Sequence, residues 1–158
     1  MESPQKFIVG VVGIIIREDK RILALRRTTG TVAARLVWET VSGKVELGED
    51  PLQAVVREIG EESGLQVEVE PRPVATWQGQ HNHGPMVLLF YKASYEAGEV
   101  SLSREHDQHA WLSPAEFSAR TCYPRLAGLI HELVDQARPS VAELASVMGC
   151  LSEAGHSS

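Results

Sequence analysis

The sequence predicts one mixed α/β domain built in layers, and three observations lead to this expectation. Short runs rich in β-branched residues, which are typical of strands, recur along the chain. Segments whose apolar residues follow helical spacing are interleaved with these runs. The chain has 158 residues, enough for one domain with a sizeable core, and shows neither internal repeats nor low-complexity linkers. We therefore expect a single domain over residues 1–158, with its core within about 7–138.

The first two strands are expected to form a hairpin. Residues 7–16 are almost entirely apolar, residues 17–20 are polar as in a turn, and residues 21–27 return as a second strand. The later segments 78–85 and 104–107 are polar and are expected to be loops. Further strands are expected over residues 37–41, 67–77, 86–95 and 109–112.

The clearest helix is expected to begin at Pro51. Asp50 can cap it, and proline suits the first helical position because its missing N–H would have no partner there. Gly64 is expected to end this helix because glycine readily adopts a positive φ angle. The stripe expected to face the core consists of Leu52, Val55, Val56 and Ile59.

Two or three more helices are expected in the last third of the chain. The run from Ser113 to Glu116 is a strong helix start, and residues 123–136 form a longer amphipathic segment. Residues 139–158 are expected to hold a short C-terminal helix, 141–150, and a frayed tail. The apolar side chains of this last helix permit it to dock on its own domain or on a second copy in a homodimer: Val141, Leu144, Val147 and Met148.

Charge and composition exclude several classes of function. A net charge of −6 argues against a nucleic-acid partner. The longest apolar run, residues 8–16, is much shorter than the ~20 residues that span a bilayer, so we expect no membrane partner and a cytoplasmic location. Cys122 and Cys150 lie far apart, which supports neither a disulfide framework nor a thiolate metal site.

Three glutamates on the first helix carry the expected chemistry. Glu58, Glu61 and Glu62 are three and four residues apart, so a helix places their carboxylates on one face. Carboxylates at this spacing repel one another unless a cation lies between them, and all-oxygen ligands suit Mg²⁺ or Mn²⁺. Taken alone, the three glutamates favour the alternative of a solvated acidic helix face, which is common in proteins.

The residues around these glutamates decide between the two interpretations. Residues 43–65 match the pattern G-x5-E-x7-R-E-U-x-E-E-x-G-U, where U is a bulky apolar residue, at every specified position. In this segment the sequence closely resembles the Nudix hydrolases, and a looser likeness in element order extends over residues 7–136. The resemblance implies an α/β/α sandwich with a mixed central sheet. It also implies hydrolysis of a nucleoside diphosphate linked to another group, X.

The resemblance assigns roles to individual residues. It implies that Glu58, Glu61 and Glu62 bind Mg²⁺, or alternatively Mn²⁺, while Arg57 and Glu49 support the loop. A further acid from a separate loop often completes such sites, and Glu105 is the candidate here. The proton acceptor stays open among Glu61, Glu105 and Asp107. Many relatives have Pro-Gly before the box, where this chain has Val41-Ser42, and the backbone carbonyl of Ser42 is the expected further metal ligand.

Other polar and aromatic residues give weaker signals. Arg26, Arg27 and Lys44 are candidate contacts for substrate phosphates, although a solvated strand end explains Arg26 equally well. Two loops carry histidines without zinc spacing, which favours ordinary loop histidines over a metal site: His81, His83, His106 and His109. Trp38 and Trp77 could stack on a base, but large core residues beside strands are the more frequent case.

The substrate expected from the resemblance is a small nucleotide-like molecule. Markers of relatives that act on ADP-ribose or on dinucleoside polyphosphates are missing, which favours a (deoxy)nucleoside triphosphate or similar small triphosphate. An ADP-ribose or nucleotide-sugar pyrophosphatase is the alternative within the family. A non-catalytic nucleotide-binding regulatory domain is the alternative from another class of protein.

Overall fold

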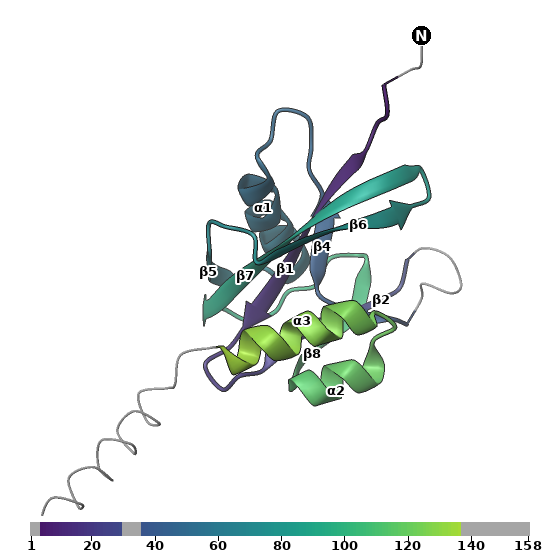
Figure 1. Ribbon diagram of the computed structural model, residues 1–158. Helices are drawn as coiled ribbons and strands as arrows, with labels where there is room; N and C mark the ends of the chain where they lie inside the picture. Colours follow the sequence, from purple (N-terminus) through teal and green to yellow (C-terminus); the bar gives the residue numbers. More distant parts are fainter. Residues whose placement is uncertain (1–3, 30–35, 137–158) are drawn as a thin grey trace, which may run out of the picture.

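The computed structural model describes residues 4–29 and 36–136, in which a mixed sheet lies between helices on its two faces (Figure 1). The expected α/β sandwich with a mixed central sheet is confirmed. The strands are β1 (Ile8–Ile16), β2 (Ile22–Arg27), β3 (Trp38–Glu39), β4 (Val41–Lys44), β5 (Gln66–Val69), β6 (Ala75–His81), β7 (Gly84–Ala97) and β8 (His106–Leu112). The helices are α1 (Pro51–Ser63), α2 (Pro114–Arg120) and α3 (Pro124–Asp135).

The expected helix at 141–150, and with it Cys150, lies outside the described residues. Within 4–29 and 36–136, none of the helices is long and apolar enough to span a bilayer.

Strand β1 is the centre of the sheet. It runs parallel to β7 along its whole length, from Ile8 opposite Met86 to Ile16 opposite Ser94. Its other side pairs antiparallel with β4 at residues 10–13 and with β2 at Ile16. The expected antiparallel hairpin of the first two strands is therefore confirmed. Strand β2 in turn carries β3 and β8, so β4, β3 and the start of β8 lie near one another.

The alternation of side chains along β1 divides the core into two layers. Val12, Ile14 and Ile16 pack under α2 and α3, whereas Val11 and Ile15 pack under α1. Gly13 also lies on the α1 side, where a Cβ would approach Cδ1 of Ile59 to 3.0 Å. The missing side chain lets α1 pack closely against the strand.

The helix ends agree with the capping residues seen in the sequence. Helix α1 begins after Asp50, and Gly64 ends it at a φ of 67°. At α2 the caps are reciprocal, because Oγ of Ser113 accepts a hydrogen bond from the Glu116 amide at 3.2 Å and Oε2 of Glu116 accepts one from the Ser113 amide at 2.7 Å. These predictions are confirmed.

Two segments that the sequence predicts to be single strands each form two strands. The run 37–41 is two strands, because the chain turns at Thr40 from pairing with β2 to pairing with β1. The run 67–77 is also two strands, β5 and β6, which pair with different halves of β7. The segment between β5 and β6 contains Pro71 and Pro73, which lack the N–H that a sheet ladder requires.

Three finer expectations are also corrected. Residues 78–85 are not a loop, because β6 continues to His81 and joins β7 through a two-residue turn. The loop expected at 104–107 ends earlier, since β8 begins at His106. Val56 does not face the core and is 51% exposed. The buried side of α1 is rotated toward Ala54 and Glu62, because Glu62 itself turns inward to β4.

Candidate active site

Arg57 ties the loop after β4 to the helix that follows it. Its Nε and Nη2 donate to the two carboxylate oxygens of Glu49, at 2.7 and 3.0 Å, in a bidentate pair. Nη2 also donates to the carbonyl oxygen of Lys44 at 3.0 Å. These bonds hold residues 44–49 against the middle of α1, where the glutamates of the helix begin.

The three helix glutamates lie in different surroundings. Glu58 contacts Nη1 of Arg57 at 2.8 Å, and its side chain is 13% exposed. A Cβ at Gly43 would overlap the Glu58 carboxyl group, so only glycine leaves room for it. Glu62 is buried, and its Oε2 accepts a hydrogen bond from the Ser42 amide at 3.3 Å. Glu61 is largely exposed and lies 3.3 Å from Arg57.

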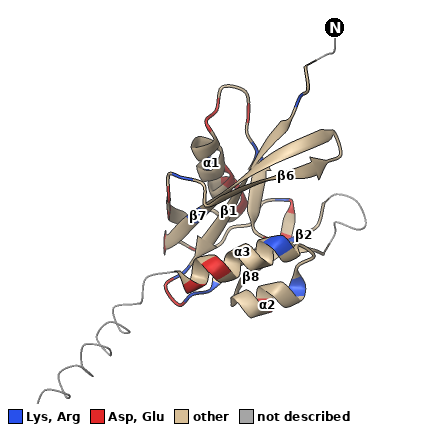
Figure 2. Ribbon diagram, viewed as in Figure 1, with Lys and Arg blue, Asp and Glu red and all other residues tan. Residues whose placement is uncertain are grey.

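Burial and repulsion between carboxylates make Glu58 and Glu62 difficult to ionise. The pKa of Glu62 is raised to about 8, chiefly by burial; the Ser42 amide opposes this rise, and the charges of Glu58, Glu39 and Glu105 add to it. Burial also raises the pKa of Glu58, against the opposing effect of Arg57. Figure 2 shows the acidic residues of α1 beside β1. A cation among these carboxylates would stabilise their charged forms.

The donor set fits a hard divalent cation. The carboxylates of Glu58, Glu62 and Glu105 face one cleft, together with Ser42. Oxygen atoms alone are the ligands that Mg²⁺ and Mn²⁺ prefer. In residues 4–29 and 36–136, no three His, Cys, Asp or Glu side chains already converge closely enough to hold a metal. Because Arg57 contacts Glu58 and Glu61, a bound cation would require small shifts of these side chains.

The opposite wall of the cleft comes from strands β2, β3 and β8. Arg27 donates from Nη1 to Oε1 of Glu39 at 3.0 Å, and its Nη2 lies 3.9 Å from Oε2 of Glu105. Nε2 of His106 lies 3.0 Å from the same Glu39 oxygen. Glu39 and His106 are buried, whereas Glu105 is half exposed at the cleft.

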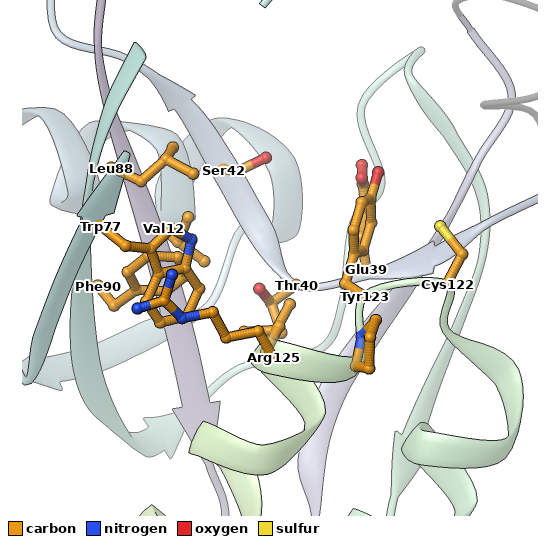
Figure 3. Close-up of a pocket in the computed structure, with 12 residues that line it drawn as sticks. Val12, Glu39, Thr40, Ser42, Trp77, Leu88, Phe90, Cys122, Tyr123 and Arg125 are labelled. Carbon is orange, nitrogen blue, oxygen red and sulfur yellow. The ribbon is translucent and has the colours of Figure 1, made fainter. Parts of the chain in front are cut away.

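The cleft has a volume of about 860 Å³ and lies beside a smaller apolar pocket of about 350 Å³. Glu39, Ser42 and Tyr123 line both spaces. The pocket is walled by Trp77 and Phe90, whose ring centroids are 3.7 Å apart. Figure 3 shows the side chain of Arg125 reaching across this wall, and its guanidinium lies 4.3 Å from the Trp77 ring centroid. A charged cleft thus adjoins an apolar pocket with aromatic side chains in its wall.

Comparison with models of protein families shows which family this chain belongs to. The model of the NUDIX domain matches residues 6–133. The chain belongs to the Nudix family. It is therefore a hydrolase that acts on pyrophosphate bonds, and members of this family generally use divalent metal ions. Residues 43–65 are its Nudix box, and the resemblance inferred from their spacing is confirmed.

Individual relatives of this Nudix hydrolase agree with that assignment. A MutT-like protein of Streptomyces ambofaciens is 35% identical over 140 residues, which cover 88% of this chain and 84% of that protein. An 8-oxo-dGTP diphosphatase of Haemophilus influenzae is 30% identical over 132 residues, covering 84% and 95%. The crystal structure of the MutT protein from Methanosarcina mazei Go1 has a TM-score of 0.72 at 19% identity, covers 87% of this chain and 100% of that chain, and shows a shared fold.

The structure brings most of the sequence-predicted residues to the Nudix cleft, but not all of them. Arg27 and Lys44 line it. Arg26 does not, because neighbouring residues of a strand point to opposite faces, and its guanidinium forms a bidentate pair with Asp107 at 2.8 and 2.6 Å. Asp107, which stayed open as the proton acceptor, is therefore turned away from the cleft. Glu61 lies at the exposed margin of the box and is not among the lining residues.

Sequence reasoning missed several residues that line or support the Nudix site. The sequence analysis singles out Trp38 but not Glu39, the next residue. It interprets His106 as an ordinary loop histidine, although the His106 side chain is 0% exposed. His81, also expected in a loop, lies on β6 and lines the cleft with Gln80. Tyr123 and Arg125, at the start of α3, line the apolar pocket. The only sequence signal for Glu39 was a charged residue inside an apolar run.

Proposed function

We propose that this Nudix hydrolase cleaves the diphosphate linkage of a (deoxy)nucleoside triphosphate or a similar small triphosphate, with Mg²⁺ or Mn²⁺ as its metal. The observation that carries the proposal is that the acidic cleft adjoins an apolar pocket and shares lining residues with it. A triphosphate bound through a metal in the cleft can place its base against Trp77 and Phe90. The 8-oxo-dGTP diphosphatase of Haemophilus influenzae, whose name gives a substrate of this class, supports the same choice.

The metal ligands in this proposal are Glu58, Glu61, Glu62 and Glu105, with the backbone carbonyl of Ser42. When bound there, a divalent ion polarises phosphate oxygens and lowers the pKa of a coordinated water. Gly43 leaves space for the Glu58 carboxyl group, and the amide of Ser42 holds Glu62 by a hydrogen bond. Arg57 keeps the box loop in place through Glu49, so its role in the reaction is to orient these ligands.

Cationic side chains at the cleft bind the substrate phosphates in this proposal. Arg27 and Lys44 line it, and both carry positive charge that offsets part of the substrate's negative charge. Arg27 is already oriented by Glu39, so it is preorganised for this contact. The proton acceptor in this proposal is Glu105 or Glu61. The cleft location of Glu105 favours the former.

Hydrolysis of a nucleotide panel tests the proposal. The panel contains unmodified and oxidised nucleoside triphosphates, ADP-ribose, nucleotide sugars and dinucleoside polyphosphates, each assayed for phosphate and pyrophosphate release with Mg²⁺, with Mn²⁺ and with EDTA. We expect metal-dependent turnover of a triphosphate, lowered by roughly 10²–10³-fold or more in Glu62→Gln. Glu70→Gln is the matched control, because it removes an exposed carboxylate that pairs with Lys92 away from the cleft.

Two outcomes would contradict the proposal. Faster turnover of ADP-ribose or nucleotide sugars than of any triphosphate would change the substrate class. An unchanged rate of turnover in Glu62→Gln, with thermal unfolding as in the wild type, would contradict the proposed role of Glu62 as a metal ligand.

A further inference from the structure

Glu105 differs from the other carboxylates proposed as metal ligands, because no helix holds it. It belongs to the segment before β8, and its side chain is 52% exposed, so its own packing does not fix it. The backbone around it is anchored to the end of β2. The carbonyl oxygen of Glu105 accepts hydrogen bonds from the amide and the hydroxyl group of Thr28, at 2.8 and 3.1 Å. These contacts place the peptide but leave the carboxylate to be positioned by others.

The next residue, His106, is completely buried and bonds to a buried acid. Its Nε2 lies 3.0 Å from Oε1 of Glu39, and a carboxylate can only accept, so Nε2 carries the hydrogen. The other nitrogen, Nδ1, is buried and has no hydrogen-bond partner in the part of the chain that the structure describes. A buried polar atom without a partner costs stability. An apolar residue would avoid that cost, so packing alone does not account for histidine at this position.

Glu39 is the junction of the contacts on this side of the cleft. Its Oε1 accepts from His106 and also from Nη1 of Arg27, each at 3.0 Å. The same guanidinium reaches Glu105 with Nη2, at 3.9 Å, and its Nε donates to the carbonyl oxygen of Thr29 at 3.2 Å. Because Glu105 and His106 are neighbours in sequence, His106, Glu39, Arg27 and Glu105 form a closed ring.

A bulge in the sheet makes this ring geometrically feasible. Strands β2 and β8 pair in regular register up to Arg26 opposite Gln108, and the register then shifts so that Arg27 lies opposite His106. Asp107 is the extra residue, and it pairs with Arg26 on the other face. Bulges of this kind turn side chains out of the ordinary alternation of a strand. Here the shift leaves His106 pointing into the core beside Glu39.

We propose that Glu39 and His106 are positioning residues that set the carboxylate of Glu105 against Glu58 and Glu62, and thereby set the affinity of the site for its divalent ion. The inference rests on the proposed function, in which Glu105 is a ligand. Neither residue needs to touch the metal or the substrate for this role. Hydrogen bonds that orient ligand carboxylates from behind commonly change metal affinity by about 10–100-fold.

Three variants test the proposal by metal binding and by activity. His106→Leu keeps an apolar side chain of similar size but removes the donor to Glu39. His106→Gln restores a donor at a comparable distance from the backbone. Arg21→Gln is the matched control, because Arg21 ties the opposite end of β2 and β8 to Glu116 and Trp111, away from the cleft. Mn²⁺ binding is measured by electron paramagnetic resonance without substrate, and the Mg²⁺ activation constant is measured in turnover with the best panel substrate.

We expect His106→Leu to bind Mn²⁺ and to be activated by Mg²⁺ about tenfold more weakly than the wild type. The kcat at saturating Mg²⁺ should fall less than the metal affinity does. His106→Gln should recover most of the affinity, and Arg21→Gln should match the wild type. Glu39→Gln, which preserves side-chain size but removes the charge that holds Arg27, should weaken Mn²⁺ binding similarly and provides a second folded variant. Thermal unfolding of each protein separates loss of affinity from loss of structure.

Equal Mn²⁺ affinity in the wild type, His106→Leu and Glu39→Gln would overturn the positioning role, whereas metal-dependent turnover in the wild type would leave the proposed function standing. Equally weak binding in His106→Leu and His106→Gln would also overturn it, because the donor would then be irrelevant. A wild-type protein that neither binds Mn²⁺ nor depends on a metal for turnover would instead overturn the proposed function, and the positioning role with it.

Discussion

The cleft has two walls that are assembled in different ways. The box wall comes from residues 42–65, and its supporting contacts join residues at most 20 positions apart, as between Ser42 and Glu62. The sheet wall consists of Arg27, Glu39, Glu105 and His106, and its contacts join distant residues, such as Glu39 and His106, which are 67 positions apart. Both walls hold carboxylates in place by hydrogen bonds to arginine or backbone groups. The comparison shows that a contiguous motif can specify half of a site while the other half depends on which strands become neighbours.

Substituting one glycine of the box wall should have the largest effect. In Gly43→Ala the new Cβ would overlap the Glu58 carboxyl group and displace it. A displacement of about 1 Å at a reacting centre lowers kcat roughly 100-fold, and we expect a loss of that order with little change in unfolding temperature. Gly60→Ala is the matched control, because a Cβ there meets open space. This control should keep wild-type activity and raise the free energy of unfolding by about 1 kcal/mol. Wild-type activity in Gly43→Ala would show that the close packing against Glu58 is not required.

Substitutions of the two neighbouring arginines on β2 should lower kcat/KM to different extents, because Arg27 lines the cleft and Arg26 lies on the outer face of the sheet. In Arg27→Gln the substrate phosphates lose a cation and Glu39 loses an ion-pair partner. We expect kcat/KM to fall roughly 10–100-fold. Arg26→Gln breaks only the exposed pair with Asp107 and should change kcat/KM less than about twofold and stability by about 0–1 kcal/mol. Similar losses in both variants would mean that Arg26 also reaches the substrate.

The pH dependence of stability should show how strongly the box wall depends on a cation. In the metal-free protein, burial raises the pKa of Glu62 from 4.5 to about 8. The folded state therefore binds a proton more tightly than the unfolded state, so this contribution to stability is fully present below pH 4.5 and is lost as the pH rises to about 8. Between these values, wild-type stability should fall relative to that of Glu62→Gln by up to about 1.4 kcal/mol per pH unit.

Thermal unfolding from pH 5 to 9 with EDTA measures that difference, and added Mg²⁺ should remove most of it above about pH 8. Glu70→Gln is the control, because the half-exposed Glu70 carboxylate pairs with Lys92 away from the cleft, and it should keep the wild-type pH dependence. Parallel pH profiles for the wild type and Glu62→Gln would show that Glu62 is already charged in the metal-free fold.

The elements with strong local signals could be predicted from the sequence. Helix α1 begins after Asp50 and ends at Gly64 because capping and positive φ are properties of those residues themselves. Helical spacing likewise places Glu58 and Glu62 on one side of the helix, where both line the cleft. Val56 was placed wrongly for a related reason. Helical spacing defines an apolar stripe but not how the helix turns about its axis, and the burial of Glu62 against β4 decided that rotation.

What only the tertiary structure decided is the sheet wall and the pocket beside it. Arg26 and Arg27 are the same residue type, so the sequence does not distinguish them. The pairing of β2 with β3 and β8 determined which of them faces the cleft. The sequence suggests that His106 lies in a loop, but the bulge directs its side chain toward Glu39. Trp77 forms part of the pocket wall because Phe90 and Arg125 lie beside it in the fold. The sequence by itself determined the family, the box and its carboxylates, because those depend on contacts within a short stretch of chain. The partners of Glu105 and the shape of the pocket depend on strand order, which no local spacing encodes.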